Sequence, residues 1–146
     1  MLSSPHLKIG LIILFSFFMN QIFGQQKYFL EVSGINSVKG NLMIGMFDNE
    51  KNFPTQGKQM KQLVVKVESK RQIIDVTDIV RGKSVVAFAV YHDVNANEKL
   101  DKNWFGVPTE VYGFSNNARG SFGPPAFDEA KIKVTQNSAS WKVVLK

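Results

Sequence analysis

The stretch KSVVAFAVYH, residues 83–92, decides the fold. It is apolar nearly throughout and rich in β-branched and aromatic residues, which is typical of a strand buried on both faces. Because successive side chains of a strand point to opposite faces, Val86, Phe88 and Val90 share one face, with His92 at its end. The odd-numbered residues take the other face. We therefore expect a central strand of a sheet.

The other apolar runs of the chain are short and alternate with polar residues. IKV (132–134) and WKVVLK (141–146) show the period of two that is typical of half-buried antiparallel strands. Turn residues separate the runs, and no ten-residue window after residue 24 carries a helical stripe. We expect an all-β fold, a seven-stranded antiparallel β-sandwich of immunoglobulin-like or transthyretin-like type, with a small closed barrel as the alternative. The expected strands are 28–33, 41–48, 63–67, 71–77, 83–92, 129–135 and 141–146.

The first 24 residues have the pattern of a secretory signal peptide. Lys8 precedes the apolar run IGLIILFSFFM, and Gly24 offers a small residue for cleavage. The run is shorter than the ~20 residues that a spanning helix needs, so we expect no membrane span in the mature chain. The sequence thus predicts a signal peptide over 1–24 and a single β-sandwich domain over 25–146. The protein would be exported to the periplasm or the cell exterior.

The composition excludes several kinds of chemistry. The chain has no cysteine, so it has no disulfides, thiol nucleophiles or thiolate metal sites. The formal charge is +6 and falls to +5 when Lys8 is removed. Residues 91–130 hold six acidic and three basic side chains, a net −3, which leaves +8 elsewhere. The lysines mostly alternate with apolar residues, which indicates solvated strand faces and argues against nucleic acid as a partner.

Oxygen-bearing side chains stand at alternate positions directly after the central strand. Asp93, Asn95 and Asn97 match positions 1, 3 and 5 of an EF-hand-like calcium loop. The backbone carbonyl of Lys99 falls at position 7, and Asp101 at position 9. Calcium takes six to eight oxygen ligands, and looping backbones supply them in this alternating way. The pattern predicts a weak calcium site of the extracellular kind.

Two residues exclude a standard EF-hand. Glu98 stands where the motif has Gly, and Trp104 stands where it has the closing Glu. A shorter loop would have to be closed by Asp101, with Glu110 or a backbone carbonyl as a further ligand. A polar turn without metal is an equal alternative, because Asn and Asp side chains mimic backbone turns.

A catalytic site has weaker support. His92 is the one histidine beyond the signal peptide, which excludes a multi-histidine metal site within one chain. Its neighbour Asp93 points to the opposite face of the strand and is badly placed to orient it. The loop serines lack a nucleophile-elbow motif. The alternative function is a hydrolase of envelope glycans or peptides that uses the loop carboxylates Asp101 and Glu110.

Residues 93–127 show no convincing strand and are unusually rich in aromatic residues. Long loops are uncommon in compact domains, and disordered segments are poor in aromatics, so we expect one long ordered loop that folds back on the sandwich. A possible ligand surface is the second interpretation, with His92 and Glu110 beside an aromatic platform for glycan or peptide. The platform residues would be Trp104, Phe105, Tyr112 and Phe114.

The run HDVNANEKLDKNWFGVPTEVYGFSNNARGSFGPPAFDEAKIKV, residues 92–134, closely resembles the domain-of-unknown-function family 2141, a family of small exported bacterial proteins. The shared pattern is His-Asp at 92–93, an Asn-rich loop ending in Leu-Asp, Gly-x-Pro-x-Glu at 106–110, Gly-Phe-Ser-Asn-Asn at 113–117 and Gly-Pro-Pro-x-Phe at 123–127. The sequence departs from the family at Glu98, where many members have Gly, and at RGKS before the central strand.

The resemblance implies an exported β-sandwich and carries over no catalytic residue, because the family is uncharacterised. We therefore expect a non-enzymatic binding or interaction module of the envelope. Its partner would be an envelope protein or a glycan, and calcium would be its one cofactor.

Overall fold

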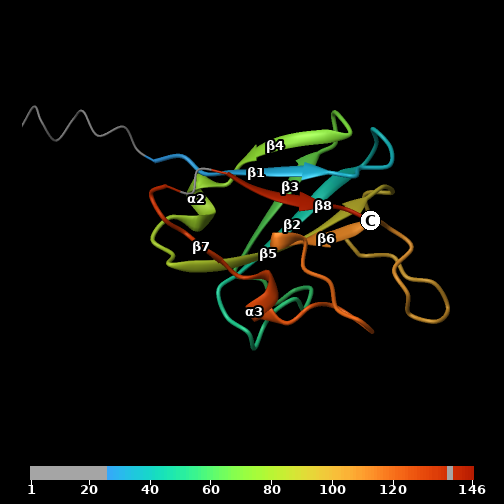
Figure 1. The fold of residues 1–146 in the computed structure, drawn as a ribbon. Coiled ribbons are helices and arrows are strands. Elements are labelled where there is room, and N and C mark those ends of the chain that lie inside the picture. Colours follow the sequence, from blue (N-terminus) through green and yellow to red (C-terminus); the bar gives the residue numbers. More distant parts are fainter. Residues whose placement is uncertain (1–25, 138–139) are drawn as a thin grey trace, which may run out of the picture.

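The computed structural model describes residues 26–137 and 140–146, and within them the chain forms eight strands in two sheets (Figure 1). Two four-residue α-helices and a 3-10 helix lie between the strands. The predicted signal peptide, residues 1–24, lies outside the described residues. No helix in the described part is long and apolar enough to cross a membrane.

The smaller sheet has three strands. β1 (Phe29–Ser33) lies between β4 (Arg71–Asp75) and β8 (Ser140–Val144). It is antiparallel to β4 but parallel to β8, and the two run side by side in Figure 1. The prediction of a fully antiparallel fold is therefore wrong for this pair. Parallel neighbours need a long connection, and β1 and β8 come from opposite ends of the described chain.

The larger sheet is built around β5 (Val85–Asp93), which lies between β2 (Asn41–Phe47) and β6 (Tyr112–Phe114). β3 (Lys61–Lys66) forms the edge beyond β2, and the short β7 (Ile132–Lys133) pairs with the start of β5. All these pairs are antiparallel. The position of β5 confirms the expectation of a central strand. Burial on both faces is confirmed only in part, because Val85, Ala89 and Tyr91 on the outer face are half-buried.

Alternate residues of both sheets point into one apolar core between them. Burial of these side chains away from water is the main favourable contribution to folding. Within the core, β5 presents the same face that the sequence predicted. The main contributors are Leu30 and Val32 of β1, Leu42, Ile44 and Met46 of β2, Val86, Phe88 and Val90 of β5, and Val143 of β8.

The two sheets are also joined by backbone hydrogen bonds at one edge. The Tyr112 N–H donates to the Lys146 carbonyl at 3.2 Å, and the Lys146 N–H donates to the Tyr112 carbonyl at 3.1 Å. This pair connects β6 of the larger sheet to the residues that follow β8 of the smaller one. The edge of β6 is thereby closed, which protects backbone groups that would otherwise be unpaired.

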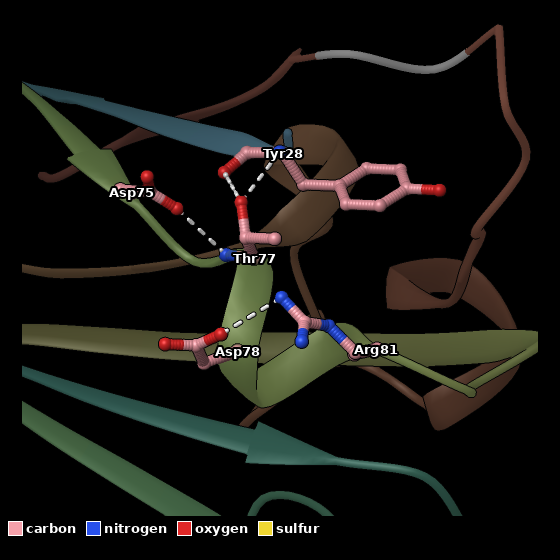
Figure 2. A network of polar contacts seen from close by, with 5 residues as sticks. All are labelled: Tyr28, Asp75, Thr77, Asp78 and Arg81. Atoms are coloured by element: carbon pink, nitrogen blue, oxygen red, sulfur yellow. Dashed lines mark hydrogen bonds and ion pairs between the residues drawn. The ribbon is translucent and has the colours of Figure 1, made fainter. Parts of the chain in front are cut away.

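The helix α2 (Thr77–Val80) begins where the sequence predicted the end of a strand over 71–77. Figure 2 shows the contacts responsible: the Thr77 N–H donates to Asp75 Oδ1 at 2.9 Å, and Thr77 Oγ1 accepts the Tyr28 N–H at 2.9 Å. These bonds turn the chain out of β4 after residue 75. The predicted strand is therefore shorter than expected.

The helix α3 (Phe127–Ala130) replaces the first part of the strand predicted over 129–135. Its first turn is fixed by the Glu129 side chain, whose Oε2 accepts the Ala126 N–H at 2.9 Å. The strand that follows, β7, keeps only two residues.

The segment 93–127 is not one uninterrupted loop. β6 and the 3-10 helix η1 (Ser115–Asn117) divide it into two connections. The described chain therefore has eight strands, compared with the seven that were predicted.

Candidate functional site

The outer face of the five-stranded sheet has a hollow at its centre. Gly45 of β2 pairs with Ala89 of β5, so two small residues lie side by side on this face. Larger side chains surround them, with Met43 and Phe47 on β2 and Tyr91 on β5. Since outward residues alternate along each strand, all five share this face. The register of β2 and β5 thus creates a depression.

One end of this face is covered by aromatic packing. Phe53, from the connection between β2 and β3, contacts the rings of Phe47, Phe114 and Phe127 edge-on, with centroids 5.4, 5.7 and 5.7 Å away. Edge-to-face pairs of this kind add to the stabilisation that burial provides. They hold the 48–60 connection beside α3, as Figure 1 shows.

The uncovered part of the face is a cavity of about 300 Å³ over Gly45 and Ala89. This volume is at the lower end of the range of ligand sites, roughly 300–1,000 Å³. Three connections form the walls, and they contribute Gln56 and Gln59, Leu100 and Pro108, and Gly123 and Pro124. The predicted surface residues Tyr112 and Phe114 also line the cavity.

The wall that contains Leu100 belongs to the loop that follows β5, and Asp93 fixes the start of that loop. The Asp93 carboxylate is buried. Its Oδ1 accepts the Asn97 N–H at 3.1 Å, and its Oδ2 accepts the Glu98 N–H at 2.8 Å. These bonds hold Ala96 and Glu98 at φ values of 58° and 62°, in the left-handed region where Gly is usual.

Asp101 closes the loop by accepting hydrogen bonds from two amide side chains. Asn95 Nδ2 donates to its Oδ2 at 2.7 Å, and Asn97 Nδ2 donates to its Oδ1 at 3.0 Å. Asn97 Oδ1 in turn accepts the Lys99 N–H at 2.8 Å. The structure therefore brings the predicted residues Asp93, Asn95, Asn97 and Asp101 into one polar network.

Glu110 ties the far end of the loop to its beginning. Its Oε1 accepts the Val94 N–H at 2.9 Å, and its Oε2 accepts the Asp101 N–H at 3.1 Å. A carboxylate that accepts two backbone N–H groups makes charge-assisted hydrogen bonds, which are stronger than neutral ones. Glu110 is thus part of the loop's internal scaffold.

The donor set of this loop suits calcium chemically, because it offers carboxylate and amide oxygens and the Lys99 carbonyl. In the described geometry, however, both Asp93 oxygens already accept backbone N–H groups, and the amide nitrogens of Asn95 and Asn97 face Asp101. Across the described residues, no group of three or more His, Cys, Asp or Glu side chains is placed to hold a metal ion. In this arrangement the polar side chains of the loop form hydrogen bonds with other groups of the same loop.

His92 lies on the opposite face of β5 from the cavity and is fully buried. Its Nε2 hydrogen-bonds to the Lys39 carbonyl at 2.7 Å, and its Nδ1 has no partner among the described residues. His92 therefore does not share an open cleft with Asp101 and Glu110. This position gives it no access to a substrate at the loop.

Trp104 and Phe105 contradict the expectation that the loop aromatics fold back on the sheet. Their residues are 97% and 88% exposed. Asn103 fixes the turn that displays them, because its Oδ1 accepts the N–H groups of Phe105 and Val107, both at 3.0 Å. The bridge between Lys102 and Pro108 closes this turn.

Gln56 is a site residue that sequence reasoning missed. Its Nε2 donates to the Glu98 carbonyl at 2.9 Å and to the Tyr91 hydroxyl at 3.0 Å, which joins two cavity walls that are far apart in the sequence. Burial raises the pKa of Tyr91 to about 12, and the nearby carboxylates of Asp93 and Glu110 add to the effect. The phenol therefore stays protonated and able to donate a hydrogen bond.

Ser115 was also missed as a structural residue. Its buried hydroxyl accepts the Phe88 N–H at 2.9 Å and donates to the Ala130 carbonyl. It thereby anchors α3 to β5 beside the cavity. The nearest sequence indication was the run GFSNN, in which a serine between a strand and a turn is well placed for such a bond.

The fold and the site define a class of small β proteins, with a ligand-sized cavity on one sheet and loops as its walls. The model of the bacterial family described as "Uncharacterized protein conserved in bacteria (DUF2141)" matches residues 30–142. The chain belongs to this family, as its resemblance indicated. No curated protein and no solved structure matches the chain.

Proposed function

We propose that this protein is an exported, non-enzymatic binding module of the bacterial envelope, built as an immunoglobulin-like or transthyretin-like β-sandwich. Its contact surface is the cavity together with the displayed turn at Trp104 and Phe105. The partner is an envelope protein or glycan. The observation that carries the proposal is a hydrogen-bonded turn that holds two large aromatic side chains in water next to a cavity.

Exposed aromatics of this kind are costly in an isolated protein. Burying one large apolar side chain contributes roughly 1.5–3 kcal/mol, and this contribution is forgone while Trp104 and Phe105 stay in water. Large exposed apolar patches commonly mark interaction sites, and Trp is enriched among residues that dominate binding energy. The Asn103 turn fixes the backbone beneath both rings. A partner would therefore meet a preorganised surface.

The loop network supports the same function. Three carboxylates accept hydrogen bonds from N–H groups within the loop, namely those of Asp93, Asp101 and Glu110. These bonds fix the wall that contains Leu100. A wall that is ordered before binding lowers the entropic cost of association. The hydrolase alternative draws no support from these positions, because the two acids point at internal donors and His92 faces the core.

For the loop we also propose calcium as the cation whose chemistry suits its oxygens. Asp93, Asn95, Asn97, the Lys99 carbonyl and Asp101 would be the ligands. Binding requires the loop amides to turn their oxygens inward and to give up internal hydrogen bonds, so the affinity would be weak. The extracellular class of calcium sites works in the range of about 10⁻⁴–10⁻³ M.

The test is capture of envelope components from a bacterial envelope extract by the immobilised protein. We expect a Trp104→Ala, Phe105→Ala double variant to lose the captured component. Ile73→Ala is the matched control, because Ile73 is 67% exposed on the smaller sheet. Identical capture by the wild type and the folded double variant would overturn the proposal.

A further inference from the structure

The floor of the cavity is apolar. Gly45 and Ala89 form its lowest part, and the side chains of Met43, Phe47 and Phe114 surround them. An ideal Cβ placed on Gly45 would lie 3.2 Å from the Phe47 ring, so the depth of the cavity depends on this glycine. Such a surface favours an apolar group of a ligand.

The polar groups of the cavity are hydrogen-bond donors or amides. None of the lining side chains is acidic, and Lys102 is the cation among them. Lys102 makes no ion pair with the described residues. Tyr91 and Gln56 meet at the same wall, where the Tyr91 hydroxyl oxygen accepts a hydrogen bond from Gln56 Nε2. The O–H of Tyr91 is left to donate to a ligand. The polar side of the cavity therefore suits an acceptor oxygen.

We propose that the cavity binds an acyl chain, with the hydrocarbon on the Gly45–Ala89 floor and the carbonyl or carboxylate oxygen toward Lys102 and the Tyr91 hydroxyl. This inference rests on the proposed binding function, because it uses the same contact surface, and it assigns the cavity itself to an acyl group instead of a glycan. A free fatty acid and the acyl group of a lipid share this chemistry.

An acyl chain fits the described lining better than a sugar does. A sugar presents hydroxyl groups around its ring, and Gly45, Ala89 and Met43 on the floor offer no side-chain partner for them. A buried polar group without a hydrogen bond costs free energy. A hydrocarbon chain carries its polar atoms at one end, which matches a cavity with an apolar floor and donors along one wall.

The experiment is native mass spectrometry and calorimetric titration of the mature protein with four probes that share one chain length. These are decanoate, methyl decanoate, decanol and decylamine. We expect decanoate and methyl decanoate to bind, decanol to bind more weakly, and decylamine not to bind. Tighter binding of decanoate than of methyl decanoate indicates a free fatty acid as the source of the ligand. The reverse order of affinities indicates an acyl ester. Equal binding of decylamine and decanoate overturns the proposal.

Two variants locate the ligand. Ala89→Leu fills the floor and should weaken decanoate binding at least about tenfold, the equivalent of 1.4 kcal/mol. Lys102→Glu changes an exposed residue without disturbing the core, and it should reduce decanoate binding and allow decylamine to bind. Lys58→Glu is the control, because Lys58 is exposed on the connection that carries Gln56 and Gln59 and does not line the cavity. An equal effect of Lys58→Glu and Lys102→Glu contradicts the assigned head position.

The ligand class and the proposed function can fail separately. If no probe binds but capture from envelope extract is lost in folded Ala89→Leu, the acyl assignment is wrong and the binding function stands. If the probes bind but capture is insensitive to the turn and cavity variants, the acyl site stands and the envelope module is wrong.

Discussion

The buried Asp93 carboxylate accepts the Glu98 backbone N–H at 2.8 Å, and Glu98 is held there at a φ of 62°. This one contact connects the end of the central strand to the wall of the cavity, because the Glu98 carbonyl is the group that Gln56 binds from the opposite wall. The strand, the loop and the 48–60 connection are therefore coupled through a single turn of backbone.

The first prediction concerns the Asp93 carboxylate itself. Asp93→Ala removes the acceptor of two backbone N–H groups in a buried setting, so we expect the free energy of unfolding to fall by about 3 kcal/mol. Asp93→Asn keeps one acceptor oxygen, so its free energy of unfolding should fall by less. Urea unfolding measures both. Asp78→Ala, which breaks an exposed pair with Arg81, should change stability by less than about 1 kcal/mol. Equal effects of Asp93→Ala and Asp78→Ala would show that the loop is not fixed from Asp93.

The second prediction concerns the backbone of Glu98. A non-Gly residue in the left-handed region costs roughly 1–2 kcal/mol, and a glycine there relieves this strain. Part of the gain in stability is offset, because glycine makes the unfolded chain more flexible. Glu98→Gly should therefore raise the free energy of unfolding by about 0.5 kcal/mol. Lys99→Gly, at the next position with an ordinary φ, should lower it. Thermal unfolding of the two variants side by side gives the answer, and a loss of stability in both would contradict the strain argument.

Elements of the fold differ in how far the sequence alone predicts them. The central strand could be predicted because its apolar run is long and needs no partner to be identified. β6, α2 and α3 could not, because each has three or four residues and depends on distant contacts such as that of Thr77 with Tyr28. Short elements carry too little periodicity, and tertiary contacts decide them.

The candidate site was predictable in its loop and in two lining residues of β6, Tyr112 and Phe114. Alternate-position oxygens identified Asp93 to Asp101, since the spacing itself carries the information. The cavity depends on the pairing of Gly45 with Ala89, and strand register is not readable from either strand alone. The exposure of Trp104 agrees only with the second interpretation, the aromatic platform, because aromatic content normally indicates burial, whereas here a closed turn displays the ring.

The third prediction concerns calcium. If the loop binds one ion in the native state only, calcium at 100 times its dissociation constant adds about 2.7 kcal/mol to the free energy of unfolding. Chelator should remove this gain, and Asp101→Asn should abolish it. An unchanged unfolding transition, together with no calcium in metal analysis of the purified protein, would leave the loop as a polar turn.

The fourth prediction concerns stability in acid. A hydrogen bond from Asn49 and the Lys83 ammonium 3.0 Å away hold the pKa of Asp48 below its ordinary value of 3.8. Because the folded-state pKa is the lower one, the contribution to stability is complete above 3.8 and declines as the pH falls through the folded value. Urea unfolding between pH ~5 and ~2 should show a weaker acid dependence in Asp48→Asn than in the wild type. Parallel pH profiles of the two proteins would contradict this assignment.

The central claim is that the hollow over Gly45 and Ala89 is where the protein meets its ligand. The most direct measurement is capture from envelope extract by Ala89→Leu, with circular dichroism and thermal unfolding as the check on folding. The half-buried Ala89 faces the cavity, so we predict that the variant folds and loses the captured component while Ile73→Ala keeps it. Undiminished capture by a folded Ala89→Leu protein would contradict the claim.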